Sequence, residues 1–312
     1  MISHTKDKPY DIVVAGEYFC DMVFTGLPEM PRTGADIYAK HFQMVPGGTY
    51  YIVLILHLLG LDVGWLTDFG NDFFSQFVLG EAQKAGIPTT LARHFDEPRR
   101  FIAASFSFEH DRGFVSYEDT PCQKRTFEEL NQMDFRCFLS PGVDDWESVE
   151  MINRLPGRNE FTLFMDCQHT SLSIHTPGMI QALQGVDIFA PNECEAMAFT
   201  GETDVFRALD VLGEIVPAVI IKRGGKGVIA RIGTERWDVP PIRVVVKDTT
   251  GAGDSFNAGF LYAHLQGLPM EDCLKYGNIT GGLSVQNAGP LQCVDINSVH
   301  EMAKNYPNYC RI

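Results

Sequence analysis

The segment of this chain best suited to chemistry is a glycine-rich turn, Gly251 to Gly253, followed at once by the carboxylate of Asp254. Glycines let a backbone bend tightly and expose consecutive N–H groups. Phe256 and Phe260 then recur at helical spacing, which places these N–H groups at the positive end of a predicted helix, where phosphate binds without a basic side chain. With Asp254 placed to accept a proton from a hydroxyl, the pattern indicates phosphoryl transfer to an alcohol.

The same residues also have a purely structural interpretation. Asp is a preferred N-cap and Gly is common in turns, so a strand-loop-helix junction can carry both without binding anything. Residue types and spacing alone leave the two interpretations open.

The run 248–259 resembles, nearly residue for residue, the C-terminal signature of the ribokinase/PfkB family of carbohydrate kinases. The resemblance implies an anion hole made by the backbone of Gly251, Ala252 and Gly253, with Asp254 as catalytic base. Because phosphoryl transfer passes through a loose transition state in which the proton moves late, this base is expected to need no large pKa shift.

Two pairs of residues are candidates to hold cations. Asn192 and Glu195 follow a predicted strand, 187–190, at the sheet edge where ligands gather in open α/β folds, and their oxygens suit Mg²⁺, directly or through water. Their spacing also fits a capping box that merely begins a helix. The resemblance links Asn192 and Glu195 to magnesium and phosphate, and the backbone oxygens of Asp248 and Thr250 to a monovalent cation such as K⁺.

Candidates for the acceptor site lie near the N-terminus. Asp21 follows the first predicted strand, and Gly47 and Gly48 precede a helical run. The resemblance implies that Asp21 holds substrate hydroxyls and that the two glycines let substrate approach the backbone; a loop Asp and a helix-entry turn are the alternatives. Where the family commonly has Asn, this chain has Ile52, which removes one polar contact and suggests a less hydroxylated or more aromatic acceptor, such as a nucleoside. The alternative is that Ile52 packs in the core and another residue supplies the contact.

A second glycine-rich loop follows an apolar run and contains Lys222, Gly225 and Gly227. It is not a Walker A loop, because Lys226 precedes Gly rather than Ser or Thr. It resembles the loop on the nucleotide side of the family's site, where Lys222 would assist ATP and the glycines would admit it; a turn between strands is the alternative. Asn278 falls where family members place an Asn near the nucleotide.

Composition limits the classes of partner. The 312 residues carry a formal net charge of −15, which argues against nucleic acid because backbone phosphates need a basic surface. Eight cysteines are scattered without a Cys-x-x-Cys pair, which is typical of a reducing compartment. The N-terminus lacks an apolar signal-like segment, and the longest apolar run, 50–59, is too short to cross a bilayer, so we expect a cytoplasmic protein without membrane contact.

The remaining pattern predicts the elements that position these residues. Short apolar strands alternate with helical runs, which indicates a mainly parallel sheet covered on both faces. We expect a single ribokinase-like domain over 1–312, an α/β fold with three α/β/α layers and a small β-sheet lid from about 18–45 and 96–120. Exposed lid edges favour a homodimer through the lid, with a monomer as the alternative. The predicted strands of the main sheet are 11–16, 61–70, 89–95, 136–140, 161–167, 187–190, 218–223, 227–232 and 236–239.

The sequence therefore predicts an ATP- and Mg²⁺-dependent kinase that transfers the γ-phosphoryl group to a hydroxyl of a sugar or sugar-like molecule. The alternatives are a nucleoside kinase of the same fold and a non-catalytic ligand-binding protein. A dinucleotide-dependent oxidoreductase is disfavoured, because the first strand leads into Gly16-Glu17-Tyr18-Phe19 without a Gly-x-Gly-x-x-Gly turn.

Overall fold

Runs rich in Ile, Val and Phe form the central sheet. The structure, a computed structural model, describes residues 9–108, 111–119, 123–140, 142–168, 170–286 and 294–306. Strands from β12 to β4 run parallel, and β13 is antiparallel to both of its neighbours. The spatial order is β14 (Glu235–Val239), β13 (Val228–Ile232), β12 (Ala218–Lys222), β11 (Ile188–Ala190), β10 (Thr162–Asp166), β9 (Phe135–Ser140), β1 (Tyr10–Ala15) and β4 (Val63–Leu66).

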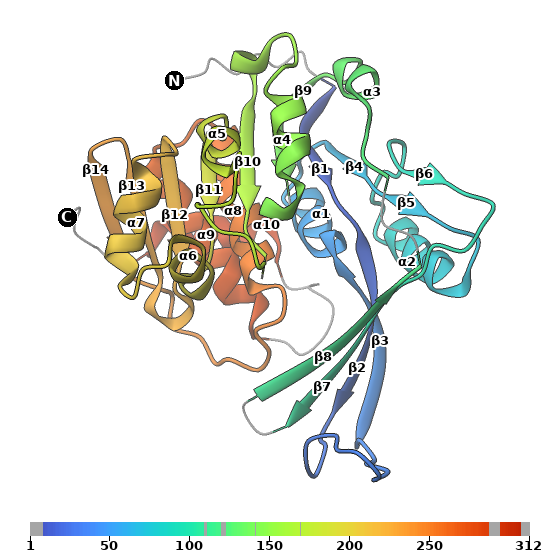
Figure 1. The fold of residues 1–312 in the computed structure, drawn as a ribbon. Coiled ribbons are helices and arrows are strands. Elements are labelled where there is room, and N and C mark those ends of the chain that lie inside the picture. The colour runs from blue at the N-terminus through green and yellow to red at the C-terminus, as the bar shows by residue number, and fades with distance from the viewer. Residues whose placement is uncertain are drawn as a thin grey trace.

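Helices cover both faces of this sheet (Figure 1). Alternation along β1 divides the core, since Ile12 and Val14 join one buried cluster and Val13 joins the other. The first cluster includes side chains of α1 (Thr49–Leu58), α2 (Phe73–Lys84), α8 (Ala252–Leu265), α9 (Met270–Ser284) and α10 (Ile296–Lys304). The second includes side chains of α3 (Phe127–Asn131), α4 (Trp146–Ile152), α5 (Met179–Gln184), α6 (Glu193–Thr200) and α7 (Val205–Gly213). These are the three layers that the sequence predicts.

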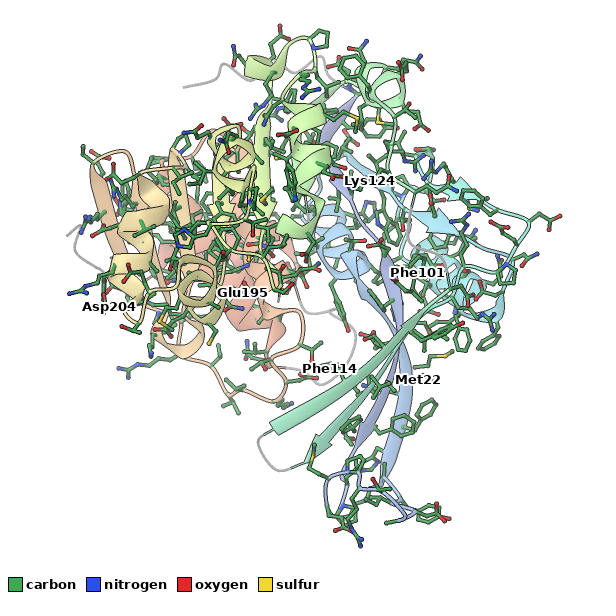
Figure 2. The ribbon with its side chains drawn as sticks, in the orientation of Figure 1. Met22, Phe101, Phe114, Lys124, Glu195 and Asp204 are labelled. Atoms are coloured by element: carbon green, nitrogen blue, oxygen red, sulfur yellow. The ribbon has the colours of Figure 1, made fainter. Side chains whose placement is uncertain are left out.

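A four-stranded sheet, here called the lid, projects from the core. Its spatial order is β3 (His41–Gly48), β2 (Tyr18–Thr25), β7 (Phe101–Phe108) and β8 (Asp111–Glu118). Figure 2 shows Phe101, which is fully buried, where the lid meets the core, and Phe114, 60% exposed, further out. The lid is confirmed. Gly47 and Gly48 end strand β3, and Gly48 is also the N-cap of α1, so the two glycines directly precede this helix. The sequence places the turn of the β7–β8 hairpin at 110–112, but Asp111 and Arg112 already belong to β8, and residues 109–110 lie outside the described residues.

One predicted strand of the main sheet is wrong. The segment 89–95 contributes only β6 (Arg93–His94), which pairs with β5 (Asp68–Phe69) in a separate two-stranded sheet. The cause is a side-chain interaction that periodicity does not reveal. The fully buried carboxylate of Asp68 binds the Arg93 guanidinium at 2.8 and 3.0 Å, which ties the segment beside β5 instead of extending the main sheet. No helix in the described part of the chain is long and apolar enough to cross a membrane.

The packing of α8 on α9 requires a glycine. A Cβ at Gly259 would lie 2.1 Å from the Thr280 hydroxyl oxygen and 2.6 Å from the Tyr276 carbonyl oxygen. We expect Gly259→Ala to lower the free energy of unfolding by about 1–3 kcal/mol in urea titrations, because it overpacks this contact. Gly80→Ala in α2 is the control: no contact atom lies within 4 Å of its added Cβ, so it should stabilise by up to about 1 kcal/mol. Similar losses in both variants would contradict this account.

Candidate active site

A cavity of about 1030 Å³ lies where the carboxyl ends of β10, β11 and β12 meet the N-terminus of α8. Binding sites form at this edge in open α/β sheets. The predicted site residues that line it are Gly48, Asn192, Glu195, Lys222, Gly225, Gly227, Gly251, Ala252, Gly253, Asp254 and Asn278. The predicted residues outside its lining are Asp21, Gly47, Asp248 and Thr250.

The turn that opens α8 has the geometry of an anion site. Gly251 is the N-cap with φ of 69°, a left-handed conformation that favours glycine. The Ser255 amide and hydroxyl both donate to the Gly251 carbonyl, at 2.8 and 2.7 Å, which fixes the turn. The N–H groups of Gly253 and Asp254 belong to the first helical turn, whose amides lack intrahelical acceptors. They lie at the positive end of a 14-residue helix.

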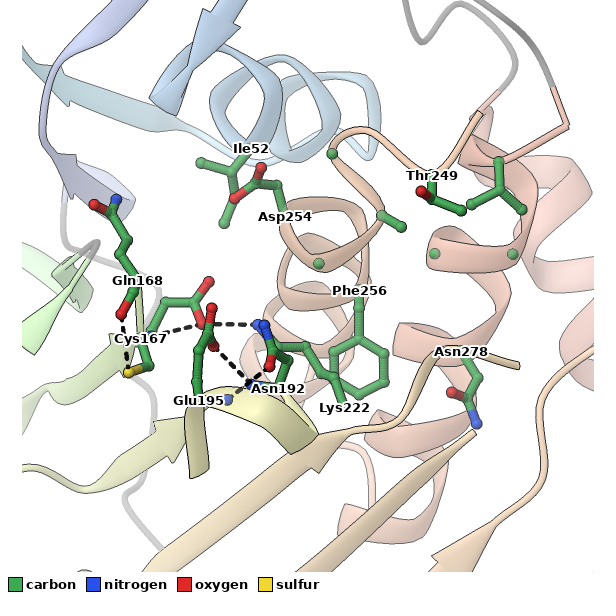
Figure 3. A pocket seen from close by; sticks show the side chains of 18 of the residues that line it. Ile52, Cys167, Gln168, Asn192, Glu195, Lys222, Thr249, Asp254, Phe256 and Asn278 are labelled. Atoms are coloured by element: carbon green, nitrogen blue, oxygen red, sulfur yellow. Dashed lines mark hydrogen bonds and ion pairs between the residues drawn. The ribbon is translucent and has the colours of Figure 1, made fainter. Parts of the chain in front are cut away.

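Asp254 is a partly buried carboxylate beside this turn, with Ile52 next to it in Figure 3. Among the described residues, none donates a hydrogen bond to its carboxylate. Burial raises the pKa of Asp254 to about 7; the negative charges of Asp166 and Glu195 add to the rise, and Lys222 opposes it. The proposed chemistry does not need this shift. The motif gives no sign of it, because both the burial and the carboxylates of Asp166 and Glu195 come from parts of the chain distant in sequence.

Asp166, at the end of β10, was not among the predicted site residues. Its Oδ1 accepts a hydrogen bond from Lys222 Nζ at 2.7 Å, and its Oδ2 accepts one from Asn257 Nδ2 at 2.6 Å. Lys222 Nζ also donates to Asn257 Oδ1 at 3.3 Å, which closes a ring of three side chains. The only available signal was an Asp at the end of a predicted strand. The ring fixes the Lys222 ammonium beneath the turn, 3.6 Å from where a Cβ on Gly253 would lie.

Asn192 and Glu195 form the capping box that was the alternative interpretation. Asn192 Oδ1 accepts from the Glu195 amide at 2.9 Å, and Glu195 Oε2 accepts from the Asn192 amide at 2.8 Å. Both residues nevertheless line the cavity. No group of three or more His, Cys, Asp and Glu suited to a metal occurs within the described ranges. The oxygens of this pair suit a Mg²⁺ ion that keeps most of its water ligands, rather than an ion coordinated by protein groups on all sides.

The acceptor candidates lie in the lid. Asp21 Oδ2 would lie 2.2 Å from a Cβ on Gly47, so the carboxylate packs directly on that backbone and requires the glycine. Burial raises the pKa of Asp21 to about 6. Phe19, on the same face of β2, reaches the cavity, together with Gly48 at the end of β3. Asp21 therefore stands behind the lining of the cavity rather than in it.

The nucleotide candidates have structural duties as well. A Cβ on Gly227 would lie 2.1 Å from the Val239 carbonyl oxygen, so the packing of β13 on β14 alone requires this glycine. Asn278 Nδ2 donates to the carbonyls of Val239 and Pro240, at 3.2 and 3.0 Å, and thereby holds the loop after β14. Gly225, by contrast, has open space at its Cβ position.

The pair Asp248 and Thr250 forms a local turn. Asp248 Oδ1 accepts from the Thr250 amide and hydroxyl at 2.9 and 2.7 Å. Both contacts are made by the side-chain oxygen of Asp248, whereas the predicted cation would bind backbone oxygens. A monovalent cation at Asp248 and Thr250 therefore stays a prediction.

Comparison with known proteins decides the family. The model of the pfkB family of carbohydrate kinases matches residues 11–297. The chain belongs to this family. Members of the pfkB family are phosphotransferases that act on an alcohol group of a sugar or nucleoside, and the predicted kinase class is confirmed.

Two curated relatives show the range of the family around this pfkB kinase. The cytidine kinase of Thermococcus kodakarensis is 27% identical over 244 residues, which cover 75% of this chain and 85% of the relative. The 2-dehydro-3-deoxygluconokinase of Bacillus subtilis is 29% identical over 255 residues, which cover 75% and 78%. The structure of Arabidopsis thaliana ribokinase complexed with ribose and ATP matches with a TM-score of 0.78 at 21% identity, over 95% and 99% of the chains. The ribokinase-like fold is confirmed.

The charges around Asp254 in this pfkB kinase give a prediction that does not depend on turnover. In Asp166→Asn, the pKa of Asp254 should fall below its value of about 7, because the negative charge of Asp166, which raises this pKa in the wild type, is gone. Lys222, which lowers the same pKa, also loses the anion that it pairs with. Carboxyl ¹³C chemical shifts followed against pH measure this. Asp238→Asn is the matched control, since Asp238 pairs with Arg223 and is not among the charges that shift Asp254. An unchanged pKa in Asp166→Asn would disprove the electrostatic account.

Proposed function

We propose that this kinase transfers the γ-phosphoryl group of ATP to a hydroxyl of a sugar or nucleoside, with Asp254 as general base and the backbone of Gly251, Ala252 and Gly253 as anion hole. One observation carries the proposal. A partly buried carboxylate, which accepts no hydrogen bond from the described residues, follows directly on an N-terminal helix turn inside a large cavity. The related ribokinase structure with ribose and ATP supports ATP as phosphoryl donor.

The proposed chemistry needs only positioning and charge. Asp254 takes the proton of the acceptor hydroxyl, and its pKa of about 7 suits proton exchange near neutral pH. The N–H groups at the start of α8 stabilise the charge that develops on the phosphoryl group in flight. Lys222, held by Asp166 and Asn257, keeps a positive charge beneath the same turn.

Asn192 and Glu195 are the residues that would hold the magnesium ion, through water. When bound, the ion would neutralise phosphate oxygens of the nucleotide. The capping box presents this pair to the cavity while fixing both side chains at the start of α6.

The acceptor has two candidate classes. Asp21 stands at the lid as a carboxylate suited to hydroxyls, which favours any sugar-bearing acceptor. Ile52 lines the cavity beside Asp254 and brings an apolar wall to the reacting centre, which favours the nucleoside alternative. A non-catalytic binding protein accords less well with a carboxylate at the anion turn that accepts no hydrogen bond from the described residues.

A homodimer through the lid, in a cytoplasmic protein, stays a proposal. Large apolar side chains on one lid face support it, with Phe42 58%, Val115 64% and Tyr117 54% exposed.

Asp254→Asn tests the proposed base. We expect magnesium-dependent ADP release with a responding acceptor to fall about 10²- to 10⁴-fold, with ATP still bound. Melting temperature at pH 8 should not fall and is expected to rise. The folded-state pKa lies above the ordinary value, so stability falls as the carboxylate ionises between about pH 4 and 7, and the variant escapes that cost. Full activity in the variant would remove Asp254 from the mechanism.

The pH profile is a second test. A base works only when ionised, so kcat/KM should decline tenfold per pH unit below an apparent pKa of about 7. ADP release measured from pH 5.5 to 9, with folding checked at each pH, gives this acidic part of the pH profile. A profile flat down to about pH 5, near the ordinary pKa of Asp, would be incompatible with the environment described for Asp254.

A further inference from the structure

The end of the cavity formed by the lid, α1 and the β1–β2 turn combines acidic and apolar side chains. Glu17 and the lid residue Glu118 line it, together with Phe19, Ile52 and Leu139. The aromatic ring and the two aliphatic side chains give this end an apolar surface beside its carboxylates, which a free sugar with hydroxyls all round would leave unfilled. This surface favours a ligand with an apolar face and hydrogen-bond donors.

Basic side chains belong to other parts of the cavity. Of the described residues that line it, only Lys222 and Arg243 are basic. Lys222 is held in an ion pair with Asp166, with its Nζ 2.7 Å from Asp166 Oδ1, at the end of β12. Arg243 follows Ile242, which packs so closely on Gly282 of α9 that an added Cβ there would lie 2.4 Å away, so the chain that carries this arginine runs beside α9.

Two residues next to the cavity lining, Asp21 and Tyr51, indicate that the electrostatic potential at this end is negative. The carboxylate of Asp21 accepts no hydrogen bond from the described residues. The Tyr51 ring packs 3.5 Å from the Cβ position of Gly251, between lid and anion turn. Burial raises the pKa of its phenol, and the charges of Asp21, Asp248 and Asp254 raise it further. A second anion in this region meets the same repulsion.

We propose that the acceptor carries no negative charge and presents a flat apolar face with hydrogen-bond donors, the chemistry of a nucleoside, and that sugar acids and sugar phosphates are rejected. The inference rests on the proposed kinase function. Glu17, Asp21, Glu118 and Asp254 supply four carboxylates at this end, and within the described residues no basic side chain lines it to receive a carboxylate or phosphate. Rejection of an anion therefore needs only the charges already present.

The test compares acceptors of different charge on the wild-type protein. Magnesium-dependent ADP release is measured at pH 8 with cytidine, ribose, 2-dehydro-3-deoxygluconate and fructose 6-phosphate. We expect cytidine to be best, and both anions to lie at least about 100-fold below it in kcat/KM, as expected for several like charges near the surface.

Glu118→Lys isolates the contribution of charge. Glu118 is an exposed lid residue outside the proposed catalytic machinery, so the variant should fold. We expect the ratio of anionic to neutral acceptor kcat/KM to rise about tenfold. The matched control is Glu29→Lys, since Glu29 pairs with Arg32 in the loop between β2 and β3, outside the cavity lining, and should leave this ratio unchanged.

The outcomes separate the two proposals. A wild-type preference for the sugar acid or the sugar phosphate, or the same ratio in Glu118→Lys as in Glu29→Lys, overturns the charge inference and leaves the kinase function standing. A failure of all four acceptors to give ADP release would contradict the kinase function instead. In that case calorimetric binding of the same four compounds decides the inference: binding of cytidine alone supports it, and binding of either anion overturns it.

Discussion

The whole site depends on how a few buried charges are balanced around the Lys222 ammonium. Asp166 accepts a hydrogen bond from that ammonium with Oδ1 and one from the Asn257 amide with Oδ2. These two contacts connect the ends of β10 and β12 to α8. Asn257 lies one helical turn after Asp254, and the tie therefore fixes the orientation of the proposed base. Without the lysine, Asp166 would be a largely buried, uncompensated anion, which a fold tolerates poorly.

The central sheet makes this balance possible. Because β10, β11 and β12 are parallel neighbours, their carboxyl ends deliver Asp166, the Asn192 capping box and Lys222 to one edge. Helix α8 packs on one side of the sheet with ten of its 14 residues buried, and its more exposed N-terminal turn lies at that edge. The lid then closes the cavity from the other side with Phe19 and Glu118.

Residue spacing was informative where the structure is local. The turn before Asp254 and the pair Asn192 and Glu195 each lie within four residues of chain, and the structure places them at the N-termini of α8 and α6, where both line the cavity. Their proposed roles stay predictions. Asp166 was missed because its partners are 56 and 91 residues away, and only the folded sheet brings them together. The false strand at 89–95 has the same origin, since a buried ion pair between Asp68 and Arg93 overrode the pattern.

Burial is the main cause of the raised pKa of Asp254, and the same distant charges add to it. The local motif reveals neither cause. Three carboxylates, those of Asp166, Glu195 and Asp254, share this edge with a single ammonium. A site with that excess of negative charge repels a bare triphosphate, on a chain whose net charge is already −15. In the proposed mechanism the nucleotide would therefore bring its own cation, and the helix N-terminus would serve the transferring group rather than the ground-state charge. At the lid end no such cation would accompany the acceptor, so under the proposal made above the acidic side chains would act on the acceptor directly and select it by charge.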